Sequence, residues 1–143
     1  MTKITATRYH DFSTGHRVWS YEVKLFIFQP QGHNYRIYLT VEADSLDSVG
    51  RVMDFSAIKE HLCYWLEQQW DHKYLIWERD PFAPTLKELD PEGTVVVQFN
   101  PTAENMGQYL IDVVGPKQLE GTGVRLIKVN IEETRMCSVA VGT

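Results

Sequence analysis

The sequence of residues 34–42 is Asn-Tyr-Arg-Ile-Tyr-Leu-Thr-Val-Glu, and this stretch decides the fold class. Tyr35, Ile37, Leu39 and Val41 alternate with mainly polar neighbours. Successive side chains of a β-strand point to opposite faces, so a period of two predicts a strand with one buried face.

Three further segments have strand character on either side of a helical region. Residues 3–12 are rich in Thr, Ile and Tyr, which favour strands. Residues 124–133 place Ile127, Val129 and Ile131 on one face, and residues 136–141 follow as the last predicted strand. The chain therefore begins and ends with a pair of strands.

Two helices are expected between these pairs. The first begins at residues 54–56, where Asp54 or Ser56 caps the free N–H groups, and its apolar side chains recur at helical spacing. The second begins near residues 100–102 and is expected to end at Gly115-Pro116. A Pro-rich connection, residues 80–93, and a short apolar run, residues 95–99, lie between the helices.

This order of elements predicts an α+β fold in a single domain, residues 1–143. Two strands, two helices and two strands imply no parallel crossover. We therefore expect a four-stranded antiparallel sheet with both helices on one face.

Composition excludes several classes of protein. The formal net charge of -5 argues against a nucleic-acid-binding protein, which usually has a basic patch. Two cysteines, Cys63 and Cys137, are fewer than a small disulfide-held secreted domain contains. The N-terminal residues have no apolar stretch typical of a signal peptide, and no run approaches the roughly 18 apolar residues of a membrane span. We expect a soluble, cytoplasmic protein.

Glu133 is the first candidate functional residue. It continues the face of Ile127, Val129 and Ile131 at the end of their strand. A carboxylate there is either hydrated beyond the core or partly buried, and a buried one needs partners. Two adjacent N–H donors of a flat heterocycle, such as a pterin or guanine edge, match a carboxylate in a bidentate manner.

Histidines supply the other candidates. His33 has the parity of the apolar face of its strand, and His16 is placed to converge with it from a neighbouring element. Each alone is more typical of a structural histidine, because catalytic zinc usually has three protein ligands. Asp71-His72 follows the first helix, and as a functional motif it would be a proton-transfer pair.

Taken together, six motifs resemble the 6-pyruvoyltetrahydropterin and 6-carboxytetrahydropterin synthase family, in family order over nearly the whole chain. They are Phe12-Ser13-Thr14-Gly15-His16-Arg17, Gly32-His33-Asn34-Tyr35, Gly50-Arg51-Val52-Met53-Asp54-Phe55 with Lys59, Asp71-His72 with Leu75, Asn100-Pro101-Thr102-Ala103-Glu104-Asn105, and Glu133-Thr134.

The resemblance implies a T-fold subunit that assembles through trimeric barrels into hexamers, with active sites between subunits. It implies action on 7,8-dihydroneopterin triphosphate, either on the biopterin route or, as favoured here, on the bacterial queuosine route to 6-carboxytetrahydropterin. It implies roles for six residues: Glu133 as pterin anchor, Thr102 at the pterin pocket, Asp71 and His72 as proton relay, and His16 and His33 as zinc ligands.

The sequence departs from the family pattern in one block. Gln31 stands where the family has another metal histidine, and the catalytic Cys expected before that motif is absent. Residues 23–28 are apolar there and have strand character. Glu22 is the candidate for a replacement base, whereas Cys63 is expected in the core and Cys137 is a weak candidate.

Three interpretations therefore stay open. The chain is an active zinc lyase with an altered base, a pterin- or purine-binding protein with impaired catalysis, or an α+β interaction domain outside the family's chemistry. Zinc content and pterin binding distinguish them.

Overall fold

The computed structural model describes residues 2–20, 31–134 and 136–143, and it describes no side chain for residues 31–33 and 134. Within these residues, six strands form one sheet in the order β4-β3-β1-β2-β5-β6. The strands are β1 (Thr5–Arg17), β2 (Gln31–Ala43), β3 (Lys73–Trp77), β4 (Thr94–Val97), β5 (Val124–Thr134) and β6 (Cys137–Gly142).

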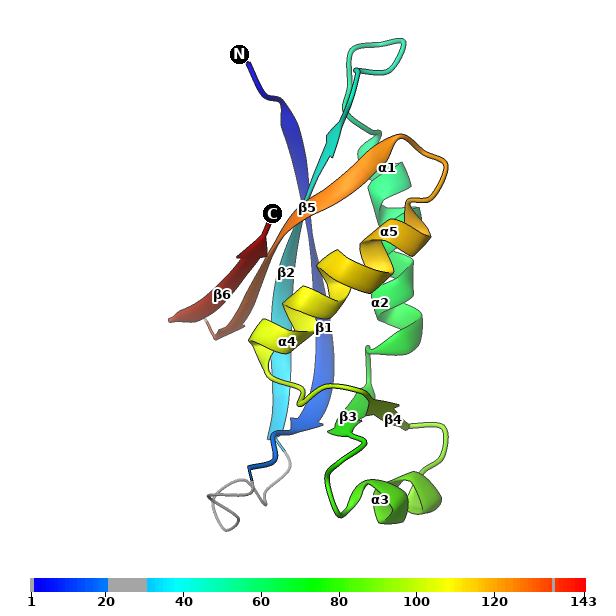
Figure 1. The fold of residues 1–143 in the computed structure, drawn as a ribbon, viewed down its shortest axis with the longest axis vertical. Coiled ribbons are helices and arrows are strands. Elements are labelled where there is room, and N and C mark those ends of the chain that lie inside the picture. The colour runs from blue at the N-terminus through cyan, green and yellow to red at the C-terminus, as the bar shows by residue number, and fades with distance from the viewer. Residues whose placement is uncertain (1, 21–30, 135) are drawn as a thin grey trace.

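Two long helices lie on one side of this sheet (Figure 1). Each contains a π-helical turn between two α-helical segments. The segments are α1 (Phe55–Ile58), η1 (Lys59–Cys63) and α2 (Tyr64–Gln69) in the first helix, and α4 (Ala103–Tyr109), η2 (Leu110–Val114) and α5 (Gly115–Gln118) in the second. A short helix, α3 (Ala83–Leu89), lies with β3 and β4 at one end of the molecule.

The core fills the space between the sheet and the two long helices. The alternation in residues 34–42 is confirmed, because Tyr35, Ile37, Leu39 and Val41 are all buried. They join one apolar cluster with residues of both helices, among them Ile58, Leu62, Leu66, Met106 and Leu110. Gly107 lets α4 approach β6, since a Cβ at this position would lie 2.8 Å from Val141 Cγ2.

The predicted helix starts are confirmed. The Asp54 carboxylate accepts a hydrogen bond from the Ser56 N–H, and the Thr102 hydroxyl accepts one from the Asn105 N–H. Each bond satisfies one of the N–H groups that a helix leaves free in its first turn.

The predicted end of the second helix at Gly115-Pro116 is wrong, because the helix continues to Gln118. The Gly115 N–H donates to Leu110 O in the π-helical turn, and a new α-helical segment then begins. Pro116 lies inside this continuous helix, where it has no N–H to donate, and the π-helical turn lies immediately before it.

The predicted sheet is incomplete. The four antiparallel strands β1, β2, β5 and β6 are present, but β3 pairs parallel to β1, and β4 pairs parallel to β3. The supposed connection and apolar run between the helices form α3 and β4. The strands with which these short segments pair are distant in the chain. The spacing of apolar residues indicates a strand but not the strand with which it pairs.

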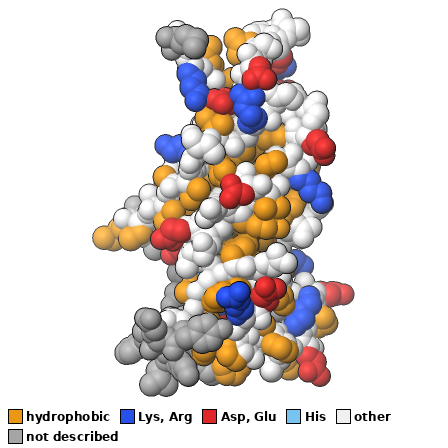
Figure 2. Space-filling view, viewed as in Figure 1, with side chains coloured by type: hydrophobic (Ala, Val, Ile, Leu, Met, Phe, Trp, Pro, Cys, Tyr) orange, Lys and Arg blue, Asp and Glu red, His pale blue; other side chains and the backbone are white. Residues whose placement is uncertain are grey.

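The visible face in Figure 2 has acidic and basic side chains dispersed among apolar ones, with no large basic area among the described residues. In the described part of the chain, the helices are too short or too polar to span a bilayer.

Candidate functional site

His16 lies near the end of β1 and is the best-defined polar group of the core. Its side chain is only 6% exposed. Nδ1 lies 2.7 Å from the carbonyl oxygen of Pro101, in the loop before α4, and Nε2 lies 3.0 Å from the hydroxyl of Tyr35 on β2. The antiparallel pairing of β1 with β2 and the loop before the second helix therefore meet at this imidazole.

These partners define the protonation of the neutral ring. A carbonyl oxygen only accepts hydrogen bonds, so Nδ1 has the proton and Nε2 has the lone pair. Burial, with the negative charge of Glu133, raises the pKa of Tyr35 above its ordinary value. The Tyr35 hydroxyl is thus protonated at neutral pH and donates to His16 Nε2.

Glu133 lies close enough to Tyr35 for its charge to act on that hydroxyl. It follows Glu132, which pairs with Arg36, so the ladder places Glu133 beside Tyr35 at the end of β5. Its side chain is half-buried. Glu133, Tyr35 and His16 therefore form one polar group on the helix-covered side of the sheet.

A zinc ion would need an imidazole nitrogen with a lone pair and, usually, three protein ligands. His16 fits this use, since metal-binding histidines commonly donate their other N–H to a carbonyl. The ladder pairs Gln31 with His16, and His33 with Thr14, at the backbone level. Among the described side chains, no three His, Cys, Asp or Glu residues gather to hold a metal, and the His33 and Gln31 side chains lie outside that set.

Asp71 and His72 form a second polar group at the junction between α2 and β3. His72 Nδ1 lies 2.9 Å from Asp71 Oδ1, which also accepts the Ser13 N–H at 2.9 Å. Asp71 is largely shielded, with 23% of its side chain exposed, whereas the imidazole of His72 is 81% exposed. The carboxylate therefore orients the ring and leaves Nε2 accessible.

The backbone at His72 is unusual, with φ at 59°. Residues other than glycine seldom adopt this left-handed conformation, and such residues often occur at functional sites. The His72 N–H donates to Ser13 O at 2.6 Å, which helps to hold the conformation. This observation favours a functional interpretation of Asp71-His72 over a chance pair.

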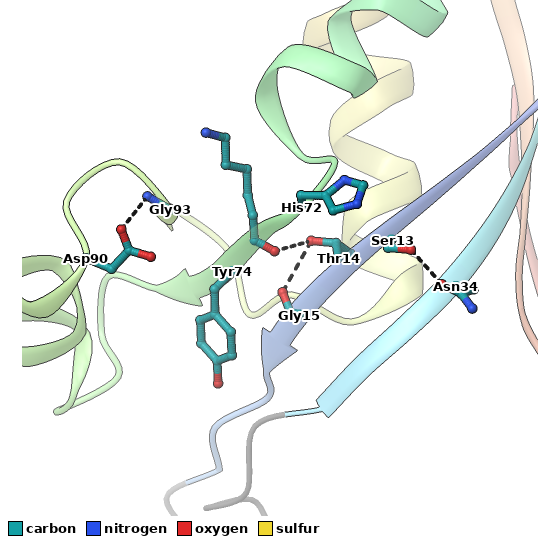
Figure 3. A pocket seen from close by; sticks show the side chains of 9 residues that line it. Ser13, Thr14, Gly15, Asn34, His72, Tyr74, Asp90 and Gly93 are labelled. Atoms are coloured by element: carbon teal, nitrogen blue, oxygen red, sulfur yellow. Dashed lines mark hydrogen bonds between the residues drawn. The ribbon is translucent and has the colours of Figure 1, made fainter.

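A groove of about 450 Å³ lies beside His72 (Figure 3). Its lining residues are Ser13, Thr14, Gly15, Asn34, His72, Lys73, Tyr74, Asp90 and Gly93. In Figure 3 the His72 ring lies beside β1, and the Ser13 hydroxyl donates to Asn34 Oδ1. Burial raises the pKa of Tyr74, which also lines the groove, to about 12.

The structure thus places the candidate residues in two groups that contact β1. One contains His16, Tyr35 and Glu133, and the other contains Asp71 and His72. Thr102 lies next to Pro101, the partner of His16, but its hydroxyl serves as the cap of α4. Of the remaining candidates, Cys63 is buried, and Cys137 is exposed at the start of β6. Glu22 lies outside the described residues.

Sequence reasoning missed two contributors to the first group: Tyr35 and the carbonyl of Pro101. The alternation of residues 34–42 and the motif that ends at Tyr35 give its hydroxyl no role. A buried tyrosine hydroxyl needs a hydrogen-bond partner, and this requirement was the available signal. A main-chain carbonyl such as that of Pro101 leaves no comparable signal in a sequence.

The sequence model of the family described as 6-pyruvoyl tetrahydropterin synthase matches residues 5–143. A curated relative is 6-carboxy-5,6,7,8-tetrahydropterin synthase of Rickettsia felis, with 28% identity over 139 residues, covering 96% of this chain and 99% of the relative.

Two solved structures share the fold. An uncharacterized protein of Wolinella succinogenes has a TM-score of 0.82 at 22% identity, over 100% of this chain and 99% of that one. A Plasmodium vivax 6-pyruvoyltetrahydropterin synthase, in a variant whose catalytic glutamate is replaced by alanine, has a TM-score of 0.71 at 17% identity, over 98% of both chains.

Proposed function

Because the chain belongs to the 6-pyruvoyl tetrahydropterin synthase family, we propose that it is a 6-carboxy-5,6,7,8-tetrahydropterin synthase acting on 7,8-dihydroneopterin triphosphate. The match to the Rickettsia felis enzyme over 99% of that enzyme's length is the observation that carries the proposal. The two polar groups on β1 supply the kinds of side chain that such a reaction needs.

Substrate binding is assigned to Glu133. Its carboxylate accepts two hydrogen bonds from the 2-amino and N3 edge of the pterin, in the bidentate manner that two adjacent N–H donors allow. Thr102 is assigned to the same pocket. Glu132 is the matched control for Glu133, because successive residues of a strand point to opposite faces.

Proton transfer is assigned to Asp71 and His72. Asp71 holds the proton on His72 Nδ1, so Nε2 is the atom that takes a proton from the substrate side chain and later returns it. The reaction shortens that side chain to a carboxylate and releases acetaldehyde and triphosphate. Glu22 is assigned as a second base, and the catalytic glutamate of the Plasmodium vivax synthase supports this choice.

His16 and His33 are assigned as zinc ligands. A bound zinc ion would act as a Lewis acid on the side-chain hydroxyls and make their protons easier to remove. On the protein side, Pro101 holds His16 so that Nε2 has the lone pair, and Tyr35 must release that atom before it can ligate. Gln31 provides an amide oxygen in place of an imidazole, so we expect weak zinc binding.

The direct test is turnover. Purified protein supplied with zinc and 7,8-dihydroneopterin triphosphate is expected to form 6-carboxytetrahydropterin, acetaldehyde and triphosphate, measured by liquid chromatography. Glu133→Gln is expected to weaken pterin binding roughly ten- to a hundredfold, since bonds to a charged group are lost. Glu132→Gln is expected to leave binding unchanged, and equal effects of both variants would contradict the assignment.

The second candidate function is pterin binding without catalysis, which Gln31 and the missing Cys favour. Asp71→Asn and Glu22→Gln separate the two functions. In an active lyase, Asp71→Asn lowers kcat roughly a hundredfold or more, with pterin affinity retained. A wild-type protein that binds pterin by calorimetry but shows no turnover with zinc supports the binding function and rejects the lyase.

A further inference from the structure

Asn100 forms an unusual pair of hydrogen bonds with the chain just beyond β1. Its side-chain oxygen accepts the Trp19 N–H at 3.0 Å, and its side-chain nitrogen donates to Trp19 O at 2.7 Å. The amide therefore pairs with both main-chain groups of one residue, as a neighbouring strand would. These two hydrogen bonds hold the loop before α4 against Trp19, which lies just beyond β1 and three residues after His16.

The main chain of the same loop is held from its other side. Asn105, in the first turn of α4, donates from its side chain to Asn100 O at 2.9 Å, and the Thr102 N–H donates to the same oxygen at 2.7 Å. Asn100 and Asn105, together the asparagine brace, therefore tie Pro101 both to β1 and to α4. Pro101 itself is buried, and its φ is fixed by its ring.

The braced carbonyl of Pro101 is the one that accepts from His16 Nδ1 at 2.7 Å. A neutral imidazole in water exchanges freely between two tautomers, so a fixed acceptor at one nitrogen selects one of them. Here the selected form has its lone pair on Nε2, which faces the hydroxyl of Tyr35.

We propose that the asparagine brace is a positioning device that sets the tautomer of His16 through the Pro101 carbonyl, so that Nε2 is the nitrogen available for chemistry. Asn100 and Asn105 are thus positioning residues and do not touch the reacting atoms. The use of Nε2, as a zinc ligand or as a proton acceptor from Tyr35, rests on the proposed function, whereas the tautomer itself does not.

The test is nuclear magnetic resonance of full-length protein with ¹⁵N-labelled histidine, before and after metal chelation. Long-range ¹H–¹⁵N correlations distinguish a protonated from an unprotonated ring nitrogen, and His16→Gln assigns the signals. The wild type is expected to show His16 protonated at Nδ1 only. Asn100→Asp keeps the side-chain acceptor but loses the donor, and Asn105→Ala loses the bond to Asn100 O. Each variant should lower the ratio of the Nδ1-protonated to the Nε2-protonated tautomer of His16 roughly two- to tenfold.

The double variant, Asn100→Asp with Asn105→Ala, should show a larger change than either single variant. Gln108→Ala, at an exposed position of α4, is the matched control and should retain the wild-type tautomer. A purely structural role would lower the unfolding free energy and leave the tautomer unchanged. A double variant that folds and keeps His16 protonated at Nδ1 only overturns the proposal, as does a wild type with Nε2 protonated.

Failure of the proposed function has a different signature. A wild type without turnover, but with the expected tautomers in all variants, rejects the lyase and supports the brace. A wild type with turnover, whose brace variants keep both the tautomer and the zinc dissociation constant, rejects the brace alone.

Discussion

The antiparallel strands β1, β2, β5 and β6 and the small parallel unit β3–α3–β4 are attached to the rest of the fold in different ways. Both contribute to one apolar cluster with the two long helices, since Leu75 of β3 and Val97 of β4 belong to it. The parallel unit is in addition attached to β1 through a buried ion pair, in which Arg17 Nε donates to Asp80 Oδ2 at 2.7 Å. The guanidinium of Arg17 also lies 4.4 Å from the ring centre of Phe82, just before α3.

The positions of the two polar groups therefore depend on different contacts. His16 and Glu133 depend on the apolar core and on the register of β1 with β2 and β5. Asp71 and His72 lie at the entrance to the parallel unit, so their position depends on the pairing of β3 with β1. Apolar packing is non-directional, whereas a buried ion pair tolerates little displacement. Different contacts of β1 thus position the two halves of the candidate site: the side chain of His16 in one, and the main chain of Ser13 in the other.

The largest expected effect comes from breaking the buried pair. Asp80→Asn removes the negative charge that faces the buried guanidinium of Arg17, and we expect a loss of roughly 3–5 kcal/mol of unfolding free energy. Hydrogen exchange should show this loss first in the amides of β3 and β4, with β2 and β5 less affected. Glu88→Gln, at an exposed position of α3, is the control, and uniform loss of protection over the sheet would contradict the separate attachment.

A somewhat smaller effect, but one distributed over the whole domain, is expected from Ile131→Ala. Ile131 is fully buried in the centre of the apolar cluster, and such truncations cost roughly 2–5 kcal/mol. Chemical denaturation should show the loss in the global transition, and hydrogen exchange should accelerate in all strands. An effect confined to β5 and β6 would show that the cluster is not one cooperative unit.

Thr102→Ala removes the cap of α4 and is expected to cost about 1 kcal/mol of unfolding free energy. Thr102→Ser keeps the hydroxyl and should retain most of that stability. The comparison also separates the cap from the proposed pocket role, because pterin affinity is measured on the same two variants. Equal stability of the Ala and Ser variants would mean that the cap contributes nothing.

The smallest effect is expected at the outer face of the sheet, where Arg36 donates to Asp11 and holds the pKa of that carboxyl below its ordinary value. The folded pKa lies below the unfolded one, so the pair stabilises at neutral pH and the contribution is lost as the pH falls through the folded pKa. Asp11→Asn should therefore lower stability slightly at neutral pH and converge with the wild type in acid. Added salt should reduce the difference in unfolding free energy between the wild type and the variant, because both charged groups are exposed. A difference in unfolding free energy that persists in acid would contradict the assignment.

Sequence periodicity was sufficient for the antiparallel strands and for the helix starts. The alternation from Tyr35 to Val41 and the caps at Asp54 and Thr102 are local features, and each is found in the structure as expected. Periodicity was insufficient for β3 and β4. These strands have five and four residues, and their unit contacts β1 through residues distant in the chain, such as Arg17 and Asp80, which are 63 residues apart.

The candidate site divides in the same way. The order of motifs alone indicated the family and named His16, Glu133, Asp71 and His72, because local sequence determines which chemical groups are available. Only the tertiary structure decided that Tyr35 and the Pro101 carbonyl occupy the two nitrogens of His16, and that Asp71 orients His72. The tautomer of a histidine and the exposure of its lone pair depend on partners distant in the chain, and these are fixed only when the chain folds.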